Sequence, residues 1–366
     1  MTTYFSYFVA LFSLLALTCL NSQAQPSNNV YRGTLPDLNA VLPDGSPIKL
    51  RELTQGKYTV LSAGCLTCPE FHKAYREVEA AAADYTPKGV QFFFVYKSLR
   101  HPEHSGYLQP QNMPERLLQM EAAKQKLETT VPWIVDTMDN EMREALGIGA
   151  NSVYLISPDG EVVYASSRLK AESLRSALVK HVGAIKQVTS ADDLNLPRIS
   201  RPSRIVNEDN DLQVKRPDGL TILKITPEKP EETYYVKLRV EAEKELLETG
   251  TGRLFLGFYP DPIHEAHWNN LTEPMQYTLT LPNGVEATPA KDQAVKGPGD
   301  TDTQPRQFWV SVKADKPIDS IQLKLDYFAC TDSLCLALTQ SYTIHFEPIN
   351  DGSRTFGMNR GSKRKK

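Results

Sequence analysis

The sequence predicts an α/β domain followed by an all-β domain, and two observations carry that prediction. Over residues 32–188, short apolar runs alternate with segments of helical periodicity, which is typical of a central sheet that is partly parallel. Beyond residue 218, apolar residues recur at every second position in short runs separated by Pro, Gly, Asn and Asp. That pattern predicts an antiparallel β-sandwich. A chain of 366 residues is long enough for each domain to bury its own core.

The elements of the first domain follow from its periodicity. Phe71, Tyr75 and Val78 recur at helical spacing and predict an amphipathic helix over 69–84. Pro69 suits the first turn of that helix, because no backbone N–H is needed there. Apolar runs predict strands, and the remaining periodic segments predict helices. The predicted strands are 58–61, 90–95, 133–135, 153–156 and 161–165, and the further helices are 116–127, 141–146 and 171–188.

The second domain is predicted over residues 218–348, with about seven short strands and no clear helix. Residues 189–217 are polar and irregular, so they are expected to form a linker. The predicted strands are 220–225, 233–240, 254–258, 275–281, 307–312, 321–328 and 334–346.

Charge and composition exclude one class of function. The chain is 40% hydrophobic and 23% charged, with a net charge of −3 and no long internal basic block, so nucleic acid is not expected as a partner. Residues 349–366 are predicted to form a basic, disordered tail that is solvated. Its last thirteen positions contain Arg354, Arg360, Lys363, Arg364, Lys365 and Lys366.

The N-terminus carries an export signal. Residues 4–20 are almost wholly apolar and precede the small-x-small sequence Ser22-Gln23-Ala24. We therefore expect a signal peptide over residues 1–24, cut before Gln25, and a periplasmic or extracellular protein. Two alternatives stay open. The apolar segment could be retained as a membrane tether, or Cys19 could be lipidated as in a bacterial lipoprotein.

The motif Cys65-Leu66-Thr67-Cys68 is the most informative feature of the chain. It follows a predicted strand and directly precedes a predicted helix. At a helix N-terminus, backbone N–H groups and the macrodipole favour a thiolate. A thiolate attacks disulfides, peroxides and other soft electrophiles, and the second cysteine can then resolve the mixed disulfide. Half of a zinc site or a static crosslink are the alternative interpretations.

After export, four cysteines remain in an oxidising environment: Cys65, Cys68, Cys330 and Cys335. Three pairings are open, and pairing within each close pair is the simplest. Cys330 and Cys335 flank a predicted hairpin turn, so their side chains can face each other. The loop that they close is tiny and would stabilise the fold by only ~2 kcal/mol, which favours a redox-active pair over a structural one.

Other cofactor and metal signals are weak. The two cysteine pairs lie in different domains, and the second spacing is longer than that of a usual zinc knuckle. His264 and His267 lie in a loop-like stretch without the His-Glu-x-x-His helix of a metalloprotease. The sequence has no phosphate loop, dinucleotide fingerprint or serine-hydrolase elbow. We therefore expect no cofactor and no metal.

Several motifs give the first domain a family resemblance. It resembles redoxins of the thioredoxin superfamily, and more specifically the iodothyronine deiodinase branch. The motifs are Pro36-Asp37-Leu38, Leu42-Pro43-Asp44-Gly45, Gly64-Cys65-Leu66-Thr67-Cys68-Pro69-Glu70-Phe71, Val95-Tyr96, His101-Pro102, Val135-Asp136-Thr137-Met138-Asp139-Asn140, Tyr154-Leu155-Ile156 and Gly160-Glu161-Val162-Val163-Tyr164.

The resemblance implies a thioredoxin-like fold and a set of site residues. The family's catalytic chalcogen stands where Cys68 stands here, so the resemblance implies Cys68 as the attacker, whereas in ordinary thioredoxins the cysteine at the position of Cys65 attacks. His101 matches a histidine that would orient or protonate the substrate. Cysteine in place of selenocysteine favours thiol redox chemistry over dehalogenation. Ordinary thioredoxins also place a cis-proline near the position of Ala150-Asn151-Ser152, where this chain has none, so we expect a different substrate groove. A cis bond at Pro132 is the alternative.

The end of the second domain carries another resemblance. The segment Asp326-Tyr327-Phe328-Ala329-Cys330-Thr331-Asp332-Ser333-Leu334-Cys335-Leu336 resembles the N-terminal periplasmic domain of the thiol:disulfide interchange protein DsbD. This implies an immunoglobulin-like sandwich in which Cys330 and Cys335 pass electrons between a thioredoxin-like partner and client proteins.

Together these observations favour an exported thiol:disulfide oxidoreductase that uses Cys65 and Cys68, with Cys330 and Cys335 as a redox relay. Its partners would be thiol or disulfide proteins, or a small thiol-reducible substrate. The first alternative is a deiodinase-like reductive dehalogenase or thiol peroxidase that uses Cys68 and His101. The second is a non-catalytic extracytoplasmic binding protein whose cysteine pairs are structural disulfides.

Overall fold

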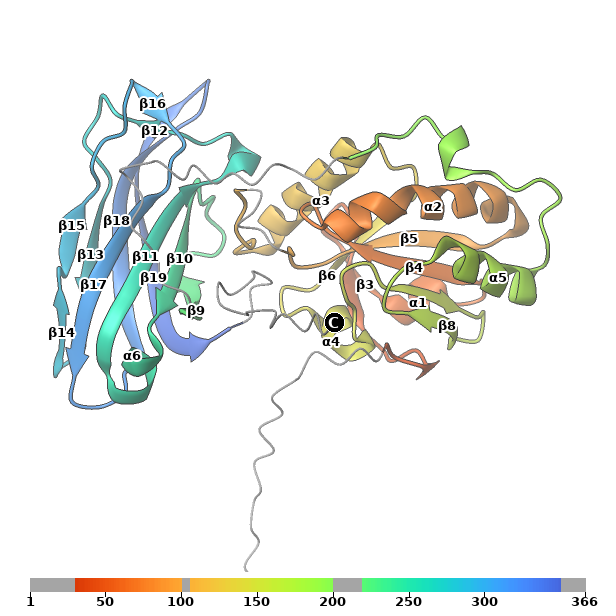
Figure 1. The fold of residues 1–366 in the computed structure, drawn as a ribbon, viewed down its shortest axis with the longest axis horizontal. Helices are drawn as coiled ribbons and strands as arrows, with labels where there is room; N and C mark the ends of the chain where they lie inside the picture. Colours follow the sequence, from red (N-terminus) through yellow and green to blue (C-terminus); the bar gives the residue numbers. More distant parts are fainter. Residues whose placement is uncertain (1–29, 101–105, 200–218, 350–366) are drawn as a thin grey trace, which may run out of the picture.

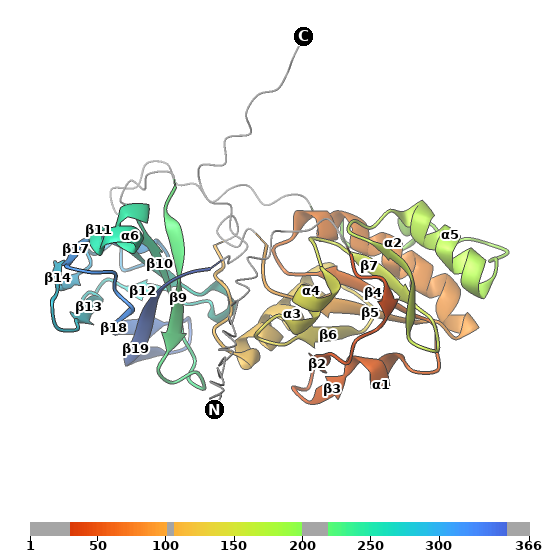
Figure 2. The same cartoon turned by 90° about the horizontal axis from the view of Figure 1, so that it is seen from below.

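A computed structural model describes residues 30–100, 106–199 and 219–349. Two bodies lie side by side, one α/β and one rich in β-strands (Figures 1 and 2). The predicted signal peptide, Cys19, His101, linker residues 200–217 and tail residues 350–366 lie outside the described residues. Within the three described ranges, no helix is both long enough and apolar enough to cross a bilayer.

The α/β domain is built on an eight-stranded sheet whose centre is parallel. Its strands lie in the order β1 (Gly33–Thr34), β8 (Glu161–Ser166), β7 (Val153–Ile156), β4 (Thr59–Gly64), β5 (Gln91–Tyr96), β6 (Trp133–Asp136), β2 (Asn39–Val41) and β3 (Pro47–Lys49). Strands β4, β5 and β6 are mutually parallel, and the other neighbours are antiparallel. Parallel strands need crossover connections, and helices α2 and α3 provide them here.

Helices cover both faces of this sheet. One core contains residues of α2 (Pro69–Tyr85), α3 (Met113–Leu127) and α5 (Ala171–Val182), and the core of the other face contains residues of α1 (Leu50–Thr54) and α4 (Glu141–Leu146). The unit β4-α2-β5 is followed by β6 and then by β7-β8-α5, with β7 antiparallel to β4. This is a thioredoxin-like arrangement, as the sequence predicts. Helix α5 is shorter than predicted, because Gly183 ends it with a φ of +114° that other residues rarely adopt.

The start of the predicted linker is packed on the α/β domain. Residues 191–193 form a 3-10 turn, and the carbonyl of Ala191 accepts a hydrogen bond from Arg76 at 2.5 Å. The carbonyl of Pro197 accepts one from the Tyr75 hydroxyl at 2.5 Å. This part of the predicted linker is therefore held against α2 through Ala191 and Pro197.

The second region is dominated by a nine-stranded antiparallel sheet. The order is β14 (Val285–Thr288), β17 (Arg306–Ala314), β11 (Thr251–Pro260), β10 (Val236–Ala242), β9 (Thr221–Pro227), β19 (Cys335–Pro348), β18 (Ser320–Cys330), β13 (Gln276–Thr280) and β15 (Lys291–Gln293). Two short strands, β12 (Trp268–Asn269) and β16 (Thr301–Asp302), form a separate two-stranded sheet.

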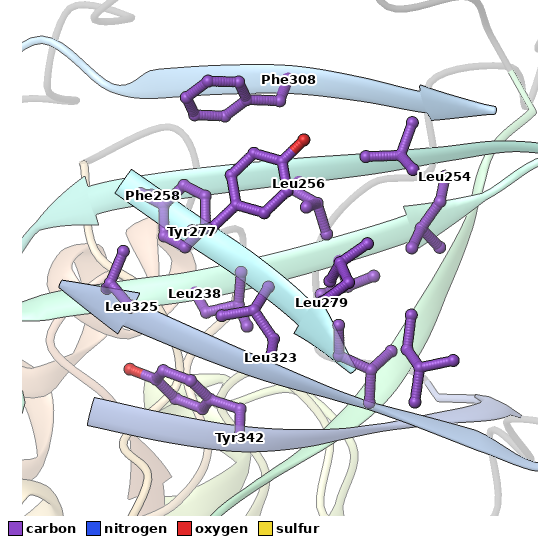
Figure 3. Packing of buried hydrophobic residues seen from close by; sticks show 14 of the residues in the cluster. Leu238, Leu254, Leu256, Phe258, Tyr277, Leu279, Phe308, Leu323, Leu325 and Tyr342 are labelled. Atoms are coloured by element: carbon purple, nitrogen blue, oxygen red, sulfur yellow. The ribbon is translucent and has the colours of Figure 1, made fainter. Parts of the chain in front are cut away.

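Strand β9 joins the two halves of this sheet. Its first two residues pair with β10, and the rest pair with β19. Side chains from both halves enclose one core, in which Phe258, Tyr277 and Phe308 are in ring contact (Figure 3). The region is thus β-rich as predicted, and the immunoglobulin-like topology stays a prediction.

The short strands β12, β14, β15 and β16 and one helix of this region were not anticipated. The prediction of no helix was wrong, because residues Lys244–Thr249 form the helix α6. It is closed by Gly250, whose φ is +81°. Six residues make fewer than two turns, so the segment is too short to show helical periodicity in the sequence.

The two bodies are joined by buried charges. Lys237 on β10 contacts the carboxylate of Glu115 on α3 and lies 3.4 Å from the carboxylate of Asp261, and all three side chains are buried. Next to them, Asn112 caps α3 by accepting a hydrogen bond from the Glu115 N–H at 2.9 Å and donates one to the carbonyl of Pro230 at 2.5 Å. Buried charges persist only when they are paired, so this cluster fixes the contact between the two bodies.

We expect Lys237→Met to lower the free energy of unfolding by about 3–5 kcal/mol, because it leaves two buried carboxylates without their cation. The matched control is Lys224→Met on β9, whose exposed pair with Glu347 should contribute less than about 1 kcal/mol. Urea unfolding of both variants measures the difference. Equal losses in the two variants would contradict the structural role of the cluster.

Candidate active site

The two cysteines of the motif lie where β4 ends and α2 begins. Gly64 is the last residue of β4, and Cys68 immediately precedes Pro69, the first residue of α2. The Cys68 N–H donates to the carbonyl of Cys65 at 3.2 Å, and the His72 N–H donates to the carbonyl of Cys68 at 3.0 Å. The motif is thus one tight turn that enters the helix. This confirms the position predicted from the sequence, at the positive end of the helix dipole.

Gly64 allows the helix to approach the strand closely. A Cβ at this position would lie 2.4 Å from the ring of Phe71. The Phe71 ring in turn packs edge-on against Phe94 of β5 and Trp133 of β6, at centroid distances of 5.2 and 5.6 Å. Strand, helix and motif are therefore held together by aromatic packing directly below the cysteines.

Both sulfur atoms are enclosed by the protein. The exposed fraction is 0% for Cys65 and 1% for Cys68. The Cys65 sulfur lies 3.7 Å from the Thr67 hydroxyl, which donates to the carbonyl of Arg100 at 2.8 Å. The Cys68 sulfur lies 3.3 Å from the carbonyl oxygen of Ala150. Any substrate must therefore reach the pair through a movement of its surroundings.

The surroundings shift the pKa values of the two thiols in opposite directions. Burial would raise the pKa of Cys65, but the hydrogen bond from Cys68 and the charge of Lys97 outweigh it and bring that pKa to about 5. The pKa of Cys68 is raised, first by its hydrogen bond to Cys65 and then by burial. These opposite shifts favour the thiolate on Cys65 and the thiol on Cys68. They agree with the order of attack in ordinary thioredoxins, and the attack by Cys68 that the deiodinase resemblance implies stays a prediction.

Two residues of the site were missed in the sequence. His72 is buried one helical turn after Cys68, and burial lowers the pKa of its imidazole to about 4, against the opposing effect of the Cys65 and Leu66 carbonyls. It is therefore neutral at pH 7. Lys97 directly follows β5 and is 1% exposed. The helical i, i+4 spacing from Cys68 could have singled out His72, and a lysine directly after a buried strand could have singled out Lys97.

The place of the thioredoxin cis-proline is taken by other groups. In the described part of the chain the cis peptide bond is Thr288–Pro289, so the Val131–Pro132 bond is trans. The carbonyl of Ala150 faces Cys68, and Asn151 donates to the carbonyl of Glu70 at 3.3 Å. The loop before β7 thus contacts the motif through the Ala150 carbonyl and the first turn of α2 through the Asn151 side chain.

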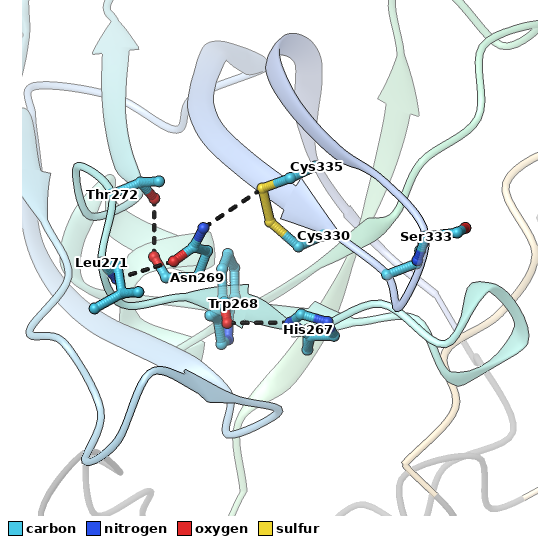
Figure 4. Close-up of a disulfide and its surroundings, with 9 residues drawn as sticks. His267, Trp268, Asn269, Leu271, Thr272, Cys330, Ser333 and Cys335 are labelled. Carbon is cyan, nitrogen blue, oxygen red and sulfur yellow. Dashed lines mark hydrogen bonds between the residues drawn. A yellow bond between two sulfur atoms is a disulfide. The ribbon is translucent and has the colours of Figure 1, made fainter.

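The second cysteine pair forms a disulfide at the end of the β18–β19 hairpin (Figure 4). The Cα atoms of Cys330 and Cys335 are 4.0 Å apart, which confirms the pairing of these two cysteines that the sequence favoured, whereas Cys65 and Cys68 are free thiols in this structure. Cys330 is buried and pairs through its backbone with His267, whereas Cys335 is exposed and lies 3.6 Å from the Asn269 amide nitrogen. Leu334 and Leu336, each 39% exposed, flank Cys335.

The two histidines considered as metal ligands in the sequence, His264 and His267, contact other groups of the protein. His264 is partly buried against the ring of Tyr235, at a centroid distance of 5.2 Å, and burial lowers the pKa of its imidazole. His267 contributes its backbone to the pairing with Cys330. Over residues 30–100, 106–199 and 219–349, no three His, Cys, Asp or Glu side chains are grouped as metal ligands would be.

No protein-family model matches this chain, and no curated protein matches it. Several solved structures are similar to the α/β domain. One is a putative thiol:disulfide interchange protein DsbE from Chlorobium tepidum, at 17% identity and a TM-score of 0.34, covering 42% of this chain and 100% of that one.

Two further solved structures give similar values. One is a secreted Mycobacterium tuberculosis disulfide oxidoreductase, at 14% identity and a TM-score of 0.31, covering 39% of this chain and 96% of that one. The other is a thiol:disulfide interchange protein from Bacteroides sp., at 15% identity and a TM-score of 0.34, covering 43% of this chain and 94% of that one.

The lowered pKa of Cys65 predicts a dependence of stability on pH. In the reduced, folded chain that pKa is about 5, against an ordinary value of 9.0, so the folded state binds fewer protons between these values. The thiolate therefore stabilises the fold fully above pH ~9, and this contribution is lost as the pH falls to about 5. Urea unfolding of the reduced wild type and of Cys65→Ser should differ increasingly as the pH rises over this range. A constant difference would show that Cys65 is not ionised.

Proposed function

We propose that this protein is an exported thiol:disulfide oxidoreductase whose active pair is Cys65 and Cys68. The observation that carries the proposal is the pair of adjacent free cysteines at the N-terminus of α2, whose surroundings lower the pKa of Cys65 and raise that of Cys68. One thiolate able to attack, next to one protonated thiol able to resolve, is the arrangement that disulfide exchange requires. The similar solved structures that bear the names of thiol:disulfide interchange proteins agree with this function. Its partners would be proteins with disulfides or thiols, or a small thiol-reducible substrate.

The exchange proceeds in two balanced steps. The Cys65 thiolate attacks one sulfur of a substrate disulfide, so that a mixed disulfide forms and the other substrate sulfur leaves as a thiolate. Cys68 then loses its proton and attacks the Cys65 sulfur, which releases the second substrate sulfur and leaves a Cys65–Cys68 disulfide. Two electrons pass from the pair to the substrate, and the proton of Cys68 ends on a released thiolate. The reverse sequence oxidises a substrate dithiol.

Cys330 and Cys335 are assigned to a relay that exchanges electrons with the first pair. Three features support this role: the exposed Cys335, the two exposed leucines beside it, and the neighbouring hollow lined in part by Phe328 and Ala337. The resemblance to the N-terminal domain of DsbD adds a thioredoxin-like partner and a periplasmic location to the proposal. Membrane attachment through the N-terminus belongs to the same proposal.

The deiodinase resemblance supports a second function less well. Reductive dehalogenation or peroxide reduction by Cys68 and His101 would need the thiolate on Cys68, whereas the surroundings lower the pKa of Cys65 and raise that of Cys68. Disulfide exchange is therefore the better supported chemistry for this site.

Trapping experiments test the order of attack. We expect Cys68→Ser to accumulate a mixed disulfide between Cys65 and a substrate protein, because the resolving thiol is absent. The matched variant Cys65→Ser should trap less, since burial still raises the pKa of Cys68 when Cys65 is absent. Non-reducing electrophoresis and mass spectrometry of the conjugate measure both.

The trapping result has two contrary outcomes. Conjugates formed by Cys65→Ser alone would assign the attack to Cys68. No conjugate with either variant, together with reduction potentials below about −300 mV for both pairs, would identify them as structural disulfides of a non-catalytic binding protein.

The relay predicts kinetic coupling between the pairs. Cys330→Ser should slow reduction of an oxidised Cys65–Cys68 pair by a thioredoxin-like donor several-fold, without changing the far-UV circular dichroism spectrum. The control is Ser333→Ala in the turn between β18 and β19, which leaves both thiols in place. Rapid acid quenching with alkylation measures the rates. Equal rates in the variant and the control would remove Cys330 and Cys335 from the electron path.

A further inference from the structure

Lys97 is a buried cation beside both thiols. Residue Gly64 of β4 is paired with Tyr96 of β5 in parallel register, and the Lys97 N–H donates to the carbonyl of Gly64 at 3.3 Å. Cys65 follows Gly64 and Lys97 follows Tyr96, so the same parallel pairing sets Lys97 next to Cys65 at one edge of the sheet. Only 1% of Lys97 is exposed. A lysine is rarely buried to this extent without a counter-charge.

The anionic groups that most strongly favour the charged form of Lys97 are the two thiols. Burial lowers the pKa of Lys97, ionised Cys65 and Cys68 raise it, and the cations Arg100 and Arg143 lower it. Arg143 comes from α4 and is occupied elsewhere, since it donates to the Ser98 hydroxyl at 2.8 Å and lies 3.6 Å from the Glu144 carboxylate. Tyr96 is buried, with its pKa well above the ordinary value, and therefore neutral near pH 7. Among the residues that the structure describes, the counter-charge of Lys97 thus comes from the active pair itself.

Building on the proposed disulfide exchange, we propose that Lys97 is the positioning cation of the pair: it stabilises the Cys65 thiolate in the reduced chain and the Cys68 thiolate in the mixed disulfide. When Cys65 bonds to the substrate sulfur, its negative charge leaves with the other substrate sulfur. The ammonium of Lys97 is then unpaired beside Cys68 and favours loss of the Cys68 proton to the released thiolate. Lys97 keeps its own proton through both bond changes.

The same geometry has a consequence for the redox equilibrium. The Cys65–Cys68 disulfide carries no charge, so only the reduced state pairs the buried ammonium. Lys97 therefore favours the reduced pair and makes its disulfide more oxidising, because stabilisation of the reduced form raises the potential. Removal of the charge should shift the equilibrium with glutathione toward the disulfide.

The test is a titration of thiolate absorbance at 240 nm between pH 3 and 8, on the reduced full chain with Cys330 and Cys335 changed to serine. We expect Lys97→Met to raise the midpoint by at least one pH unit, which is a tenfold change in the ionisation constant, and to move the glutathione equilibrium at least tenfold toward the disulfide. The matched control is Lys73→Met, an exposed cation on α2 that pairs with Glu70. It should leave both values unchanged. Equal midpoints for the two variants would overturn the proposal.

A second measurement needs no substitution at position 97. Nitrogen-15 NMR of the lysine ammonium groups follows the ionisation of Lys97 in the wild-type chain, and we expect it to lose its proton at a lower pH when the Cys65–Cys68 disulfide is formed. Identical titration in the two redox states would overturn the proposal. Disulfide turnover by the wild type is measured alongside, and its absence would overturn the proposed function, whereas an unchanged Lys97 titration overturns only the role of Lys97.

Discussion

The close contact between Gly64 and the Phe71 ring is the constraint on which the active site depends. It brings the start of α2 against the end of β4, and the ring is itself held by Phe94 and Trp133 of the two neighbouring strands. Because the parallel register then sets residues at the ends of β4 and β5 side by side, Cys65 and Lys97 share one enclosed space. Packing of apolar groups thus determines the electrostatics of the thiols.

Burial and reactivity are linked at this site. A thiol pair shielded from water interacts strongly with every nearby charge and hydrogen-bond partner, which is why its two members ionise so differently. The same shielding restricts access, since neither sulfur is exposed. The disulfide of the β-rich region differs, because its Cys335 is exposed while Cys330 is buried.

Much of the architecture could be predicted from the sequence, because apolar residues recur with a clear period in most of the longer strands and helices. The strands around 90–95 and 153–156 and the helix after Pro69 lie where the pattern placed them. Helix α6 could not be predicted, since six residues are too few to show the helical period of apolar residues. The cysteines were evident from their spacing, but their ionisation depends on Lys97, which is distant in sequence and is brought close only by strand pairing. His101, which the resemblance implied, lies outside the described residues.

The charges between the two bodies have a further consequence. Mobile ions screen exposed charges over a Debye length of about 8 Å at physiological ionic strength, but they reach buried pairs far less effectively. Lys237, Glu115 and Asp261 are enclosed, whereas the pair of Lys224 with Glu347 is open to solvent. The contact of the β-rich region with α3 is therefore expected to hold in dilute and concentrated salt alike.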